Sequence, residues 1–161
     1  MRFPKTVREH LVKLLDWSDA HVSFDDAVAG LPAAARGEVP EGLPYSPWQL
    51  VEHIRLAQAD ILEFCLSPTY EEKRWPADFW PESPKPPSAR AWNASLAQIR
   101  KDRRALQRVA ANSRCTLTAR VPAGDGQTVL RELLLAADHT AYHVGELIVV
   151  RRLLGNWPRR G

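Results

Sequence analysis

Apolar residues recur every three or four positions in four segments of the chain, and stretches rich in proline and glycine separate these segments. This spacing lines up apolar side chains on one face of a helix. It predicts helices from about residue 6 to 28, from 46 to 67, from 89 to about 109 and from about 128 to 155. Four amphipathic helices can bury their apolar faces only against one another, so the pattern predicts an all-α fold, a four-helix bundle.

Signals at the ends support two of these helices in particular. Ser46 is a candidate N-cap, Pro47 suits the first helical position, and Gln49 completes a capping box. At the end of the fourth helix, Gly155 is a candidate stop, and the two preceding arginines, 151 and 152, complement the helix dipole.

Two connections have features of their own. Residues 68–87 contain six prolines together with Trp75, Phe79 and Trp80. Prolines restrict the backbone and the aromatic rings need packing partners, so we expect a long ordered connection between helices 2 and 3 that covers one end of the bundle and walls part of a pocket. The run 116–121 is β-prone, and we expect an extended segment over the bundle.

The chain length of 161 residues suits one domain, spanning residues 1–161. The apolar fraction of 45% and the charged fraction of 25% exclude wholesale disorder. No uninterrupted apolar run approaches the roughly 18 residues of a membrane span, and the first residues lack the apolar core of a signal peptide. Cys65 and Cys115 provide no disulfide framework, so we expect a cytoplasmic protein without a membrane partner.

The net charge is +3 at pH 7, and the densest basic runs are residues 100–104 and the pair Arg159 and Arg160. The first run, which contains Arg100, Asp102, Arg103 and Arg104, is predicted to form the solvated face of the third helix. Nucleic-acid binders instead collect cations on one element and interleave them with aromatic residues. We therefore expect no nucleic-acid partner.

Two of the five histidines, His139 and His143, are four residues apart in the fourth helix. At about 100° per residue they lie about 40° apart on one face, so both imidazoles can reach the same cation. Their neighbours on that face are largely apolar, which points the face into the bundle. His53, on the inward face of the second helix, is the candidate third ligand. Three histidines suit a divalent transition metal, with zinc or nickel expected first and copper or iron(II) also compatible.

A different interpretation of each candidate stays open at this point. Inward histidines can also be core residues that hydrogen-bond within the protein. His21 is expected either to line the same cavity or to bond a backbone carbonyl. Glu146 projects about 20° from His139, where it can accept a proton during catalysis or hold a ligand imidazole. Asp60 lies two turns beyond His53 and needs a partner, for which an arginine of the fourth helix is a candidate.

Three segments together resemble the DinB-like superfamily, also called DinB/YfiT-like: residues 50–62 with His53, the aromatic stretch 75–81, and residues 130–146 with both later histidines. The resemblance implies a four-helix bundle with up-down-down-up topology and a long crossover. It also implies a divalent metal held by three histidines, which match His53, His139 and His143. Members of the superfamily often dimerise, and characterised members include thiol-dependent transferases and isomerases.

These implications lead to an expected function. The first expectation is a metal-dependent enzyme that acts on a small-molecule substrate, by transfer of a low-molecular-weight thiol. The alternatives are a metal-dependent hydrolase with Glu146 as base and a non-enzymatic metal-binding or stress-related bundle. The first and fourth helices also carry more apolar surface than one core needs, so we expect a homodimer that packs along them.

Overall fold

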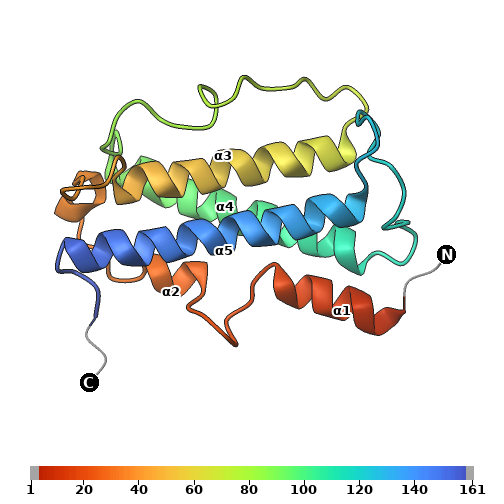
Figure 1. The fold of residues 1–161 in the computed structure, drawn as a ribbon, viewed down its shortest axis with the longest axis horizontal. Coiled ribbons are helices and arrows are strands. Elements are labelled where there is room, and N and C mark those ends of the chain that lie inside the picture. Colours follow the sequence, from red (N-terminus) through yellow and green to blue (C-terminus); the bar gives the residue numbers. More distant parts are fainter. Residues whose placement is uncertain (1–3, 159–161) are drawn as a thin grey trace.

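The computed structural model describes residues 4–158, and Figure 1 shows its course. Within this range the fold is helical and has no strand, only an isolated bridge between Arg120 and Thr128. The helices are α1 (Lys5–Leu14), α2 (Phe24–Val28), the short 3₁₀ helix η1 (Ala34–Gly37), α3 (Pro47–Leu66), α4 (Ala89–Ala111) and α5 (Val129–Leu153). The prediction of an all-α fold is therefore confirmed.

Four helices, α1, α3, α4 and α5, lie along one another as a bundle (Figure 1). Helix α3 packs against α4 and α5, and α1 packs against the same two helices. Helices α3 and α4 run in the same direction, while α1 and α5 run in the opposite one. The long connection between α3 and α4 makes this possible, because it returns along the length of α3 before α4 begins (Figure 1).

The ends of the three long helices follow the capping residues. At α3 the hydroxyl of Ser46 accepts a hydrogen bond from the backbone N–H of Gln49. The side-chain oxygen of Gln49 accepts one from the backbone N–H of Ser46, which completes the predicted capping box. At α4 and α5 the cap is a single bond, in which the side chains of Ser88 and Thr128 accept from the backbone amides of Ala91 and Arg131. Gly155 follows α5 with a φ of 69°, a conformation that favours glycine.

The prediction of one helix over residues 6–28 is wrong. Helix α1 ends at Leu14, and α2 begins at Phe24. The apolar spacing continues across the break, but the Ser23 side chain accepts from the Asp26 amide and starts a new helix. Residues 116–121 form no strand, but the prediction of an extended segment holds in part, because a turn at residues 117 and 118 leads into the bridge of Arg120 with Thr128. Leu117 and Val121 are buried.

Helix α4, the third of the four helices that the sequence predicts, does not have the fully solvated basic face that was expected. Asp102 and Arg103 are buried, although Arg104 is exposed. Arg103 forms ion pairs with Asp16 and Asp25, from the segment between α1 and α2 and from the start of α2. These acidic partners explain why an arginine lies beneath the surface there. The other basic pair, Arg159 and Arg160, lies outside the described residues.

The buried apolar residues form two clusters, one above the other along the bundle. Along α3 the first cluster ends at Ile54, and the second begins at Ile61. Along α5 the second cluster ends at Ala137, and the first resumes at Val144. On α5, the residues between these limits include both His139 and His143. These two histidines therefore lie where the two apolar clusters meet.

One described helix, α5, has the length and mean hydropathy of a membrane span, with a value of 1.2 over 18 residues. This helix packs against α1, α2 and α3 and contributes the fully buried Leu133 and Leu147 to the two clusters. It also buries two charged side chains, Glu132 and Arg151. Part of its apolar surface therefore lies in the core, while Leu134, Val149 and Leu153 remain exposed.

Candidate metal centre

The structure brings together the three histidines that the sequence singles out. One ligand nitrogen from each of His53, His139 and His143 lies within 4.8 Å of the others. The Nε2 atom of His139 is 3.0 Å from Nε2 of His53 and 3.1 Å from Nε2 of His143. The predicted i, i+4 pair on α5 thus faces the single histidine of α3 across the helix interface.

Hydrogen bonds on the other ring nitrogens fix the tautomers of two of these side chains. His53 Nδ1 lies 2.9 Å from the carbonyl oxygen of Phe79, and His143 Nδ1 lies 2.6 Å from Oε2 of Glu146. A carbonyl and a carboxylate only accept, so both Nδ1 atoms carry a hydrogen, and the Nε2 atom of each ring presents a lone pair when the ring is neutral. The neutral ring of His139 carries one hydrogen, so it can donate a hydrogen bond to at most one of these two Nε2 atoms. A cation between the three nitrogens satisfies all of them, so these residues fit a metal ion.

Burial keeps the imidazoles of His53 and His139 neutral. It lowers the pKa of His53, against the opposing effect of the Phe79 carbonyl. Burial also lowers the pKa of His139 to about 3, and the neighbouring rings of His143 and His53 add to the effect. Metal ligands must be deprotonated, so two of the three side chains are in the form that binds a cation.

Glu146 lies behind His143, on the side of the ring opposite Nε2. Its Oε2 accepts from His143 Nδ1, while its Oε1 accepts a 2.7 Å hydrogen bond from the hydroxyl of Tyr45. Both carboxylate oxygens therefore have partners within the protein. Of the two roles considered for Glu146, this geometry fits that of holding a ligand imidazole.

The crossover between α3 and α4 supplies the wall on the His53 side. Trp80 stacks on the His53 ring, with centroids 3.9 Å apart and planes 8° apart, and Tyr45 stacks on Trp80 from 6.0 Å. Phe79 is buried, and its carbonyl oxygen holds His53. Trp75 also approaches the His53 ring, at 6.0 Å, but its side chain is largely exposed.

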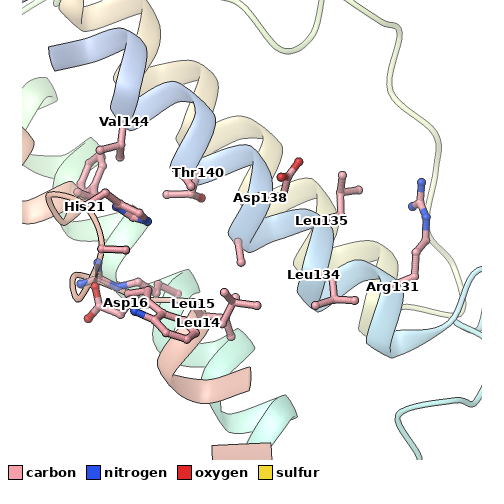
Figure 2. Close-up of a pocket in the computed structure, with 16 residues that line it drawn as sticks. Leu14, Leu15, Asp16, His21, Arg131, Leu134, Leu135, Asp138, Thr140 and Val144 are labelled. Atoms are coloured by element: carbon pink, nitrogen blue, oxygen red, sulfur yellow. Dashed lines mark ion pairs between the residues drawn. The ribbon is translucent and has the colours of Figure 1, made fainter. Parts of the chain in front are cut away.

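His21 does not join the triad. It is exposed, and its Nδ1 lies 2.9 Å from the carbonyl oxygen of Val22. It borders a groove of about 660 Å³ between residues 14–24 and α5, with Thr140 and Val144 on the helix side (Figure 2). The triad is on a different flank of α5, so the proposal that His21 lines the same cavity is wrong, whereas its bond to a backbone carbonyl is as expected.

Asp60 has a different partner from the one proposed. It accepts hydrogen bonds from the hydroxyl of Tyr70 and from Nζ of Lys73, both in the crossover, rather than from an arginine of α5. The crossover folds back beside α3 and brings these side chains to Asp60. Arg131 of α5 pairs instead with the buried carboxylate of Glu132.

Tyr45 and Cys65 illustrate what the sequence did and did not reveal. Tyr45 lies in a connection before α3, where no periodicity marks it, and its bond to Glu146 joins residues 101 positions apart. Nothing in the sequence indicates this contact. Cys65 is buried as expected for an apolar filler, and burial raises the pKa of its thiol to about 12.

Comparison with known proteins identifies the family. The family model of the DinB superfamily matches residues 17–147, a range that includes all three histidines of the triad. Neither a curated protein nor a solved structure shows significant similarity to the chain. The match covers most of the chain and agrees with the helical bundle. The chain therefore belongs to the DinB superfamily.

Proposed function

We propose that this protein binds a divalent transition metal, zinc or nickel first, through His53, His139 and His143. The observation that carries the proposal is the fixed direction of two lone pairs. The Phe79 carbonyl and the Glu146 carboxylate hold the Nδ1 hydrogens of His53 and His143, so both Nε2 atoms face the same space. Membership of the DinB superfamily supports the same assignment.

The surroundings of the triad favour an accessible site over a closed structural one. His139 is only partly buried. Trp75 and Tyr142 lie against the His53 and His143 rings, yet their side chains are 68% and 63% exposed. Three neutral protein ligands leave at least one coordination position for a small molecule. The exposed aromatic rings give such a molecule apolar surface to contact.

We further propose that the protein is a metal-dependent enzyme that transfers a low-molecular-weight thiol to a small electrophilic substrate. A bound divalent cation lowers the pKa of a thiol and stabilises the thiolate. The chain's own part is to hold the imidazoles of His53 and His143, through Phe79, Trp80 and Glu146, and to offer Trp75 and Tyr142 to the substrate. In the transfer, sulfur loses its proton, bonds to the electrophilic carbon, and the leaving group departs with its electron pair.

Hydrolysis with Glu146 as base is the alternative enzyme class. It requires a carboxylate free to accept a proton from water at the metal. Both oxygens of Glu146 are engaged, by His143 and by Tyr45, which favours thiol transfer over this alternative. A non-enzymatic metal-binding bundle is the third possibility, and activity assays separate it from the other two.

Metal analysis of untagged protein tests the proposal. The wild type is expected to contain one equivalent of zinc or nickel, and His139→Ala to contain almost none while remaining helical by circular dichroism. His21→Ala is the matched control, because this exposed histidine bonds only a neighbouring carbonyl, and it should retain the metal. Full occupancy in His139→Ala would refute the site. Turnover with and without small thiols, before and after chelation, then tests the reaction.

A further inference from the structure

Tyr45 contacts both Glu146 and Trp80, the side chains that hold two of the candidate metal ligands. It is partly buried, directly before the Ser46 cap of α3. Its hydroxyl donates a 2.7 Å hydrogen bond to Oε1 of Glu146, and its ring stacks on Trp80, with planes 19° apart. One side chain therefore reaches α5 through its oxygen and the crossover through its ring.

Each of these contacts is one step from an imidazole of the triad. Glu146 accepts from His143 Nδ1 at 2.6 Å, and Trp80 stacks on His53 with centroids 3.9 Å apart. The His53 and His143 rings are themselves 4.5 Å apart. The five side chains thus form a closed circuit, in which Tyr45 is connected to His143 through Glu146 and to His53 through Trp80.

The backbone around Tyr45 is held firmly. Ser46 is fully buried, and its hydroxyl donates to the carbonyl oxygen of Pro84. The side chain of Gln49, which completes the capping box, donates to the carbonyl oxygen of Pro81. The start of α3 and the crossover therefore fix the position from which Tyr45 extends. Restrained support of this kind is what orients metal ligands in proteins.

The hydroxyl of Tyr45 acts as a donor over the whole physiological range. Burial, together with the hydrogen bond to Glu146 and the charge of that carboxylate, raises the pKa of Tyr45 to about 12. The phenol therefore stays protonated. With Oε1 held by Tyr45, the other oxygen of Glu146 is aimed at His143.

We propose that Tyr45 is a positioning residue that fixes two of the three metal ligands. Its hydroxyl orients His143 through Glu146, and its ring orients His53 through Trp80. Tyr45 itself does not touch the metal. The inference rests on the proposed metal site and adds a residue that neither the family match nor the triad assigns.

The two functions of the side chain are separable by substitution. Tyr45→Phe removes the hydroxyl and keeps the stacking ring, whereas Tyr45→Leu removes both. Loss of a partner that orients a ligand typically costs about 10- to 100-fold in metal affinity. We expect Tyr45→Phe to weaken Co²⁺ binding by about 10-fold and Tyr45→Leu by more. The visible absorption bands of bound Co²⁺ should also shift, because the ligand geometry changes.

Tyr70→Phe is the matched control. Tyr70 also extends from a connection, packs against an aromatic ring, Phe64, and donates to a carboxylate of α3, Asp60, which lies two turns from His53. Removal of the Tyr70 hydroxyl deletes a comparable hydrogen bond but leaves the contacts of Tyr45, Glu146 and Trp80 in place. We expect Tyr70→Phe to bind Co²⁺ with the wild-type affinity and spectrum.

The outcomes separate this inference from the metal proposal. If the wild type binds no Co²⁺, Zn²⁺ or Ni²⁺, the metal proposal fails, and the role of Tyr45 fails with it. If the wild type binds Co²⁺ and Tyr45→Phe has the same affinity and spectrum, only the role of Tyr45 is refuted. Equal weakening in Tyr45→Phe and Tyr70→Phe also refutes it, because general loss of packing then explains both. Tyr45→Phe decides the result, since it deletes a single oxygen.

Discussion

The two flanks of α5 differ in what their side chains contact. On one flank, His139 and His143 meet His53 of α3, beside the crossover. On the other flank, residues such as Leu134 and Val144 border the groove beside α1 and α2 (Figure 2). That groove has a volume of about 660 Å³ and a mostly apolar lining. The converging nitrogen atoms lie on the other side of the same helix.

The contrast shows that the size of a cavity and its chemistry have separate origins. The groove lies where the chain turns between α1 and α2, so the break in the predicted first helix contributes to its shape. The triad depends instead on particular hydrogen-bond partners, because His53 and His143 each donate to a fixed acceptor. Buried polar groups without partners are costly, so the triad flank carries the stronger indication of function.

The largest expected effect is stabilisation by metal on the triad flank. At a zinc concentration of 100 times the Kd, binding stabilises the folded state by about 2.7 kcal/mol. For a domain of this length, that raises the Tm by roughly 5–10 °C. Differential scanning calorimetry should show this rise for the wild type and for Leu134→Ala on the groove flank. His53→Ala should show none, and an equal rise in His53→Ala would contradict the contrast between the flanks.

This first prediction depends on residues that the sequence identified well. The ends of α3, α4 and α5 follow from Ser46, Ser88 and Thr128, because a capping side chain acts within three residues of its own position. The pairing of His139 with His143 follows likewise from their i, i+4 spacing on an inward face. Such local rules need no knowledge of the rest of the fold.

Features that depend on distant contacts were not predictable in this way. Apolar spacing continued through the break at residues 15–23 and hid the local cap signal of Ser23, whereas the ion pairs of Arg103 with this segment require the packed bundle. The contact of Tyr45 with Glu146 requires the packed bundle. The partner of Asp60 depends on the path of the crossover, which the sequence did not specify.

The second prediction concerns the outward face of α5. Its exposed apolar side chains include Leu134, Val149 and Leu153, and the space above Gly145 is open. We expect a homodimer that packs along α1 and α5 and buries more than about 1,000 Å² in total. Val149→Glu would place a charge in that interface and weaken association by about 100-fold, equivalent to about 2.7 kcal/mol. Analytical ultracentrifugation at micromolar concentration measures this, and a monomeric wild type would refute the dimer.

The third prediction sharpens the role of Glu146 on the triad flank. At saturating metal, Glu146→Gln should keep the metal bound and slow thiol-dependent turnover by less than about 10-fold, since the residue orients His143. A general base contributes about 10²-fold or more. Steady-state kinetics of a thiol-dependent reaction distinguish the two roles. A loss of 10²-fold or greater would favour hydrolysis with Glu146 as base.

The smallest expected effect lies at the end of the groove, where Arg103 binds two carboxylates with different titration behaviour. Burial alone would raise the pKa of Asp25, but hydrogen bonds from Arg103 and Arg100 outweigh it and lower the pKa. For Asp16, burial dominates over the attraction of Arg103, and the pKa is raised. The ionised carboxylates of Asp25 and Asp16 therefore contribute to stability with opposite signs.

A group with a lowered pKa stabilises the folded state above its unfolded pKa, and this contribution disappears as the pH falls through the folded pKa. Asp25→Asn should therefore destabilise the protein at pH 7 and have less effect below pH 4, whereas Asp16→Asn should be neutral or slightly stabilising at pH 7. Both side chains are more than one-third exposed, so solvent screening limits each change to about 0.5 kcal/mol. Urea unfolding at the two pH values measures the difference. Equal destabilisation by both variants at pH 7 would show that Arg103 holds the two carboxylates alike.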